Sequence, residues 1–161
     1  MAKLEFSGLS DYIASLERLE ASVDGITKKA LYQGAAVVAD DIRASVESLP
    51  TDESYGTQKH PAKGIKKGQK EALAKGLGVA PFQEDEGMIH TLIGFSGYSN
   101  YPTKKYPKGQ PLALIARVAE SGTSFSRKTP FVRKAIRKEK PKAEQAMKEV
   151  FEKEIDKIMK E

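Results

Sequence analysis

The sequence predicts an α+β fold, in which N-terminal helices and a long C-terminal helix pack on a small, mainly antiparallel sheet. Apolar residues recur at helical spacing in the first 50 residues and again after residue 130. Short apolar runs bounded by glycine and turn residues lie between these two regions, as strands do. Because 161 residues is a usual length for one domain, we expect a single domain over residues 1–161.

The first 50 residues are expected to form a short strand and then helices. Residues 3–6 (KLEF) alternate polar and apolar side chains, which is typical of a strand. The spacing of apolar residues predicts a helix over residues 11–23, and a second apolar stripe follows over residues 26–49. Since Asp24-Gly25 separates the stripes, the second is either a separate helix or a kinked continuation of the first. Its small residues at 34–39 would let a neighbouring element approach closely.

The middle of the chain is expected to hold a long loop and a hairpin. Over residues 51–68 the periodicity is lost and glycine, proline and lysine gather, which predicts a long, mobile, basic loop. Residues 69–75 can form one or two helical turns. Residues 77–82 and 88–96 are typical of two strands, and the acidic turn between them predicts a hairpin.

The last third is expected to form a central strand and the C-terminal helix. Residues 112–119 (LALIARVA) are an apolar run suited to a central strand. Thr129 fits an N-cap and Pro130 the first helical position, because a proline there leaves no backbone N–H unpaired. Pro141 should kink the helix or divide it in two, because proline interrupts the hydrogen bonds of a helix interior.

The net charge of +5 is unevenly distributed. Residues 57–75 hold six lysines against one glutamate, and residues 126–161 hold twelve basic against seven acidic residues, so the rest of the chain is acidic. This asymmetry fits a charged partner or nearby nucleic acid, although a solvated surface is the simpler interpretation. Residues 97–111 carry three tyrosines among lysines, which suits nucleic acid and a polar protein interface equally. The residues expected to face a partner or DNA are Lys59, Lys63, Lys66, Lys67, Lys104 and Lys105.

Catalytic and metal chemistry find little support in the sequence. The chain has no cysteine, which excludes disulfides, thiolate nucleophiles and cysteine-bound zinc. Its two histidines are not clustered with acids, and the phosphate-binding, dinucleotide-binding, zinc-protease and serine-hydrolase motifs are all missing. We therefore expect no catalytic residue, cofactor or metal. No apolar run suits a signal peptide or a membrane span, so we expect a protein made and kept in a cytoplasm.

One stretch stands out, because an apolar run leads into Glu120-Ser-Gly-Thr123 and then into a proline-phenylalanine step and a basic helix. Gly122 can take a positive φ and end the preceding strand, while Thr123 and its neighbours can cap backbone groups in the turn. Phe131 would fold back on the core. We interpret this corner as a structural joint made by Glu120, Gly122, Thr123, Thr129, Pro130, Phe131 and Arg133.

This order of residues resembles that of the head-to-tail joining, or tail-completion, proteins of long-tailed bacteriophages and prophages, the family that includes minor tail protein Z. The resemblance lies in the small-residue helix at 34–40, the hairpin, the glutamate-x-glycine-threonine step at 120–123 and the Pro130-Phe131-hydrophobic-Arg133 step. It implies a structural virion protein, made in the bacterial host cytoplasm and without catalytic residues.

The resemblance also implies partners. The subunit would form a ring of six between the head connector and the tail tube or terminator, with DNA passing through the ring. Two alternatives remain open: a tail terminator subunit, and a small basic nucleic-acid-binding domain, which the basic segments and the tyrosine-lysine loop would suit.

Overall fold

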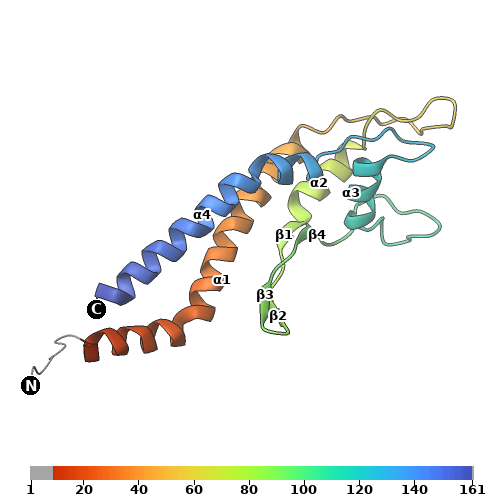
Figure 1. The fold of residues 1–161 in the computed structure, drawn as a ribbon. Coiled ribbons are helices and arrows are strands. Elements are labelled where there is room, and N and C mark those ends of the chain that lie inside the picture. Colours follow the sequence, from red (N-terminus) through yellow and green to blue (C-terminus); the bar gives the residue numbers. More distant parts are fainter. Residues whose placement is uncertain (1–8, 161) are drawn as a thin grey trace, which may run out of the picture.

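Four helices and a β-hairpin make up residues 9–160, which the computed structural model describes (Figure 1). The strand predicted for residues 3–6 lies outside the described residues. The predicted α+β class, with a long C-terminal helix, is confirmed. The elements are α1 (Leu9–Glu47), α2 (Lys67–Gly76), β1 (Leu77–Val79), β2 (Gln83–Asp85), β3 (Met88–His90), β4 (Ile93–Phe95), α3 (Leu112–Ser121) and α4 (Val132–Lys160).

Helices α1 and α4 run antiparallel and side by side over most of their length (Figure 1). They approach closely at Gly34, where an added Cβ would lie 2.6 Å from the sulfur of Met147. Ion pairs join the helices on both sides of this contact, between Lys29 and Glu154 at 3.0 Å and between Asp41 and Lys138. The close approach predicted from the small residues at 34–39 is therefore confirmed.

The two positions where the long helices were expected to break or bend, Asp24-Gly25 and Pro141, leave both helices continuous. Helix α1 is continuous through Asp24-Gly25 but changes direction in its N-terminal half, so the second stripe is a bent continuation of the first (Figure 1). Helix α4 is one helix through Pro141, so the division of this helix at the proline does not occur. Helix α4 contacts α1 on both sides of Pro141, through Lys138 and through Ala143, whose carbonyl lies beside Gly34.

The predicted hairpin is confirmed, although it is divided into two short pairs. Strand β1 pairs with β4, and β2 pairs with β3, both antiparallel. Glu86 and Gly87 form the turn at its tip with φ of 48° and 78°, the left-handed geometry that suits a two-residue hairpin turn. The hairpin packs against α1 and α3.

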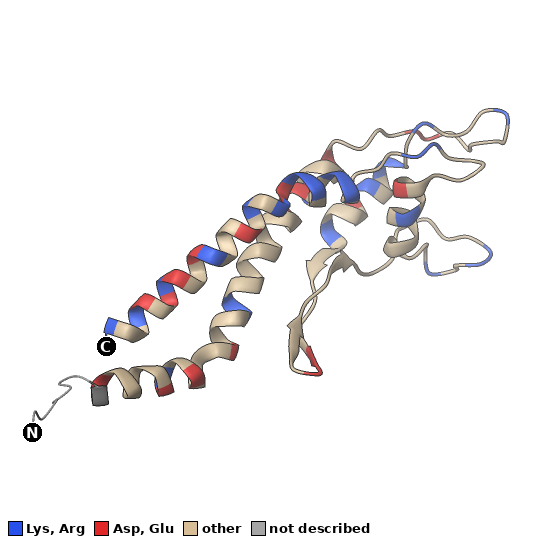
Figure 2. Cartoon of the chain, in the orientation of Figure 1, with Lys and Arg blue, Asp and Glu red and all other residues tan. Residues whose placement is uncertain are grey.

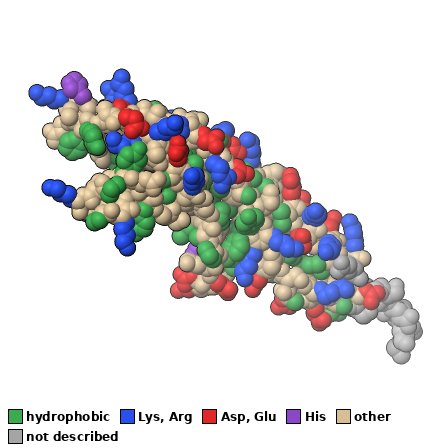
Figure 3. Space-filling model, turned by 180° about the vertical axis from the view of Figure 1, so that it is seen from behind, with side chains coloured by type: hydrophobic (Ala, Val, Ile, Leu, Met, Phe, Trp, Pro, Cys, Tyr) green, Lys and Arg blue, Asp and Glu red, His purple; other side chains and the backbone are tan. Residues whose placement is uncertain are grey.

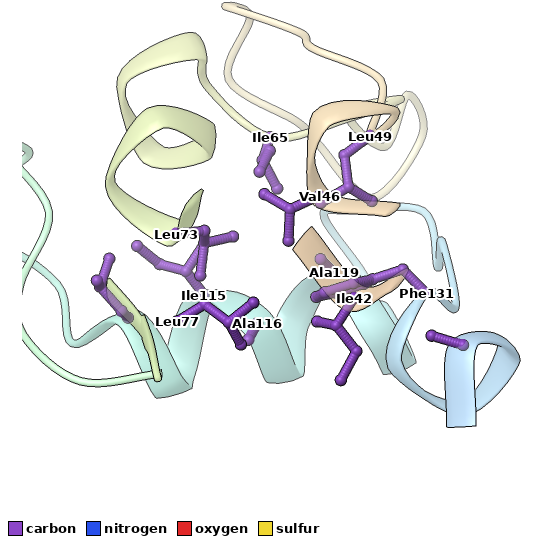
Figure 4. Packing of buried hydrophobic residues seen from close by; sticks show 12 residues of the cluster. Ile42, Val46, Leu49, Ile65, Leu73, Leu77, Ile115, Ala116, Ala119 and Phe131 are labelled. Atoms are coloured by element: carbon purple, nitrogen blue, oxygen red, sulfur yellow. The ribbon is translucent and has the colours of Figure 1, made fainter. Parts of the chain in front are cut away.

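The hydrophobic core lies at one end of the molecule, where the end of α1 meets α2, α3 and the start of α4 (Figure 4). Leu73 of α2 and Val46 of α1 are fully buried there. The predicted central strand over residues 112–119 is wrong, because these residues form α3. Its buried positions are Leu112, Ile115, Ala116 and Ala119, and this spacing of three, four and seven residues is that of one helix face. Among residues 9–160, no helix has an apolar stretch long enough to span a bilayer.

Candidate interaction surface at the loop end

Three loops project from the core in one direction, and together they form what we name the loop end: residues 48–66, 96–111 and 122–131 (Figure 1). Most of the residues singled out from the sequence lie here. The third of these loops joins α3 to α4 and contains the predicted corner.

The carboxylate of Glu120, at the end of α3, caps the N-terminus of α4. It accepts hydrogen bonds from the backbone N–H groups of Phe131 at 2.7 Å, Val132 at 2.9 Å and Arg133 at 3.2 Å, and from Nε of Arg133 at 2.8 Å. Partial burial favours the neutral acid, but these hydrogen bonds outweigh it and lower the pKa of Glu120 below 4.5. A negative charge at a helix N-terminus also interacts favourably with the helix dipole.

Gly122 follows as the predicted positive-φ residue, with φ 72° and ψ 174°. This region of backbone conformation is almost restricted to glycine. The turn after it is closed by backbone hydrogen bonds between Thr123 and Ser126 in both directions, and the hydroxyl of Thr123 accepts from the N–H of Phe125 at 3.2 Å. The prediction for Gly122 and Thr123 is confirmed, except that the glycine ends a helix and not a strand.

Phe131 is buried in the core, as predicted. It contacts the ring of Phe95, with the ring centroids 6.0 Å apart. The predicted start of the helix is wrong by two residues. Thr129 and Pro130 precede α4, which begins at Val132, and the capping oxygen comes from Glu120. The N–H of Thr129 instead donates to the carbonyl of Ala119 at 2.6 Å, which ties the corner back to α3.

The loop of residues 48–66 is held by two acidic residues that are not among the predicted site residues. Asp52 accepts from the backbone N–H of Ser54 at 2.9 Å and of Lys63 at 2.8 Å, and Glu53 accepts from the N–H of Lys67 at 2.7 Å. Hydrogen bonds from the side chain of Ser54 and from the backbone lower the pKa of Asp52 to about 2. An aspartate two residues before a serine is a turn signal that could have identified it. Helix α2 begins at Lys67, so the loop ends earlier than predicted; its mobility stays a prediction.

The loops are joined to one another. The backbone of Ala62 pairs with the corner, donating to Phe125 and accepting from Arg127, both at 2.9 Å. The side-chain amide of Gln69 donates to Gln110 at 2.8 Å, which links α2 to the loop of residues 96–111. That loop is closed at its base by the buried hydroxyl of Ser99, which accepts from the backbone N–H of Gln110 at 3.2 Å.

The lysines expected to face a partner divide into two kinds. Lys66 is half-buried, and its Nζ lies 4.1 Å from the ring centre of Tyr55 and 5.6 Å from that of Tyr101, so it bridges two loops. The others are exposed around it at the loop end: Lys59, Lys63, Lys67, Lys104 and Lys105. The structure therefore brings the two predicted lysine groups to the same end of the molecule (Figure 2).

Between the loops lies a groove of about 340 Å³. We name it the loop groove. Its walls combine apolar and aromatic side chains with eight polar or charged ones, among them Asp52 and Lys66. Exposed apolar side chains lie between the lysines at this end (Figure 3). The residues of the groove used below are Tyr55, Lys66, Tyr101, Leu114, Val118 and Phe125.

The hairpin tip and the first turns of α1 are the mainly acidic parts of the molecule. Glu84, Asp85 and Glu86 are exposed at the hairpin tip, and the first turns of α1 are acidic as well (Figure 2). His60 is exposed in the first loop and His90 lies in β3. Within residues 9–160, no three or more histidine, aspartate or glutamate side chains gather as a metal site would require.

Comparisons of the chain with protein-family models, with curated proteins and with solved structures each find no match.

Proposed function

We propose that this protein is a non-enzymatic structural subunit of a bacteriophage or prophage particle, which forms a ring of six between the head connector and the tail tube during head-tail joining. It is made in the bacterial host cytoplasm and ends in the virion. The proposal rests on the resemblance of the motifs at Glu120–Thr123 and Pro130–Arg133 to those of the tail-completion family.

The observation that carries the proposal is the chemistry of the corner. Glu120, Phe131 and Arg133 contact one another or the core, and Gly122 has a backbone conformation that other residues avoid. A structural role alone therefore accounts for the two motifs, at Glu120–Thr123 and Pro130–Arg133, in which this chain resembles the family. A structural ring subunit needs no catalytic residue, and it needs surfaces for its neighbours, which the loop end offers.

The test is to disrupt the gene in the phage or prophage that encodes it and to examine the particles by electron microscopy. We expect filled heads and complete tails that stay separate, and joining after purified protein is added. Tails of abnormal length would indicate the tail terminator alternative instead. Normal, infectious particles would refute both the head-tail joining proposal and the tail terminator alternative.

The nucleic-acid-binding alternative is favoured by one observation, the gathering of Lys66, Tyr55 and Tyr101 at the loop end among exposed lysines. Tyrosine rings can stack on bases, and lysines can neutralise phosphates. This reading predicts DNA binding whose affinity falls steeply as salt increases. Fluorescence anisotropy with labelled single- and double-stranded DNA, at low and physiological salt, measures it. Absence of binding at low salt would exclude this alternative.

A further inference from the structure

The first turns of α1 present an apolar stripe to solvent. We name residues 11–24 the arm. Tyr12, Leu16 and Val23 are between 42% and 53% exposed, and at 100° per residue they lie within one narrow face of the helix, with Leu19 on the same face. This face is therefore only partly covered within residues 9–160, where Leu19 is half-buried and Met159 of α4 lies beside Tyr12. The arm also carries four acidic residues against Arg18, so its net charge is −3.

The loop groove has the complementary character. Phe125 is 53% exposed and Tyr55 is 88% exposed, which is far more than aromatic side chains usually show, and Leu114 and Val118 form part of the groove. Lys66 forms part of the groove, and the loops that line it carry the exposed Lys59, Lys63, Lys104 and Lys105. An acidic helix with an apolar stripe therefore matches this groove both in charge and in apolar contact.

The arm and the groove of one chain cannot meet. At 1.5 Å per residue, the helix between Asp24 and Glu47 separates them by roughly 35 Å. Figure 1 shows the arm and the loops at opposite ends of the molecule. Contact between them requires a second copy of the chain.

We propose that the arm of one copy docks in the loop groove of the next copy, with its apolar stripe against Tyr55 and Phe125 and its acidic residues against the loop lysines. This contact joins two different surfaces, so its repetition produces a closed ring or an open chain. The inference deepens the proposed function by naming the surfaces through which subunits would meet, and it rests on that function only for the closure of the ring.

The absence of cysteine from the chain allows a direct test by disulfide cross-linking. Leu16→Cys in one preparation is mixed with Phe125→Cys in another under mild oxidation, and non-reducing electrophoresis measures the mixed dimer. The matched control is Met88→Cys, at an exposed hydrophobic residue of β3 outside the groove. Docking raises the local concentration of the paired cysteines, so we expect the Leu16–Phe125 dimer to form about tenfold faster than the Leu16–Met88 dimer.

A charge exchange supplies the second measurement. Glu20→Lys with Asp24→Lys in the arm, or Lys63→Glu with Lys104→Glu at the loop end, should each slow cross-linking, and combining the reversed arm with the reversed loops should restore it. All these residues are exposed, and circular dichroism checks that each variant is folded.

Two results would overturn the docking. In the first, Leu16→Cys cross-links to Phe125→Cys and to Met88→Cys at equal rates. In the second, Leu16→Cys chains cross-link faster with one another than with Phe125→Cys chains. The two proposals fail separately. Cross-linking without joining of heads and tails would refute the proposed function and keep the docking, whereas joining without cross-linking would do the reverse.

Discussion

The cap on α4 yields the sharpest prediction, because it depends on one side chain. Replacing Glu120 by alanine removes the acceptor for the N–H groups of Phe131, Val132 and Arg133. The Glu120 side chain is only 13% exposed, so water replaces it incompletely. We therefore expect Glu120→Ala to destabilise the protein.

The magnitude follows from the contacts. Loss of a helix cap costs about 1 kcal/mol. Loss of a negative charge at the helix N-terminus adds about 0.5 to 1 kcal/mol. The ion pair with Arg133 adds about 0.5 kcal/mol, because Arg133 is 67% exposed. We expect a total of about 2 to 2.5 kcal/mol.

Urea unfolding followed by circular dichroism measures the change at pH 7. Glu120→Gln keeps one acceptor oxygen and the size of the side chain but loses the charge, so it should cost about 1 kcal/mol. Arg133→Ala is the matched control for the ion pair and should cost about 0.5 kcal/mol.

The pH dependence tests the role of the charge. The folded protein lowers the pKa of Glu120, so the stabilisation is present above 4.5 and is lost as the pH falls through the folded value. The difference in stability between the parent protein and Glu120→Gln should therefore shrink below pH 4.5. If Glu120→Ala melts like the parent, or if the difference is the same at pH 3 and pH 7, the capping argument is wrong.

Three further substitutions test other contacts by the same unfolding measurement. Gly122→Val should cost about 2 kcal/mol or more, because its backbone is in a glycine region, whereas Ser121→Val beside it should cost little; equal effects would contradict the corner. Phe131→Ala should cost about 3 to 5 kcal/mol, since it empties a buried site; a loss under 1 kcal/mol would place Phe131 outside the core. Gly34→Val should destabilise by about 1 to 3 kcal/mol through contact with Met147, and Met147→Ala should relieve part of this loss if the contact is the cause.

The hairpin, the close helix approach and Gly122 could be predicted from local sequence, because each depends on neighbouring residues. Acidic turn residues between apolar runs specify the hairpin, and small residues at 34–39 permit the contact with α4. Helix α3 could also have been predicted from the sequence. Leu112, Ile115, Ala116 and Ala119 repeat at helical spacing, and leucine and alanine favour helices, but a short apolar run is ambiguous by period alone.

The cap of α4 and the loop groove could not be predicted in this way. Glu120 reaches the N–H of Phe131 across 11 residues, so local rules pointed to Thr129 as the cap instead. The groove joins Tyr55, Tyr101 and Phe125 from three separate loops, and no local pattern indicates that these loops meet. The sequence indicated that these lysines face a partner, but it did not indicate that they gather at one end of the molecule.

The close contact of Gly34 with Met147 has a consequence for how this protein can change in length. It fixes the position of α1 along α4, because a slip by one turn, about 5.4 Å, would bring a larger side chain to the glycine position. Residues added or removed between Gly34 and the core would separate Asp41 from Lys138. Residues added or removed between the arm and Gly34 would likewise separate Lys29 from Glu154. Changes within the arm would leave both ion pairs in place and alter only how far the arm extends. Related chains should therefore differ in length in the arm and keep the spacing between the glycine and the core.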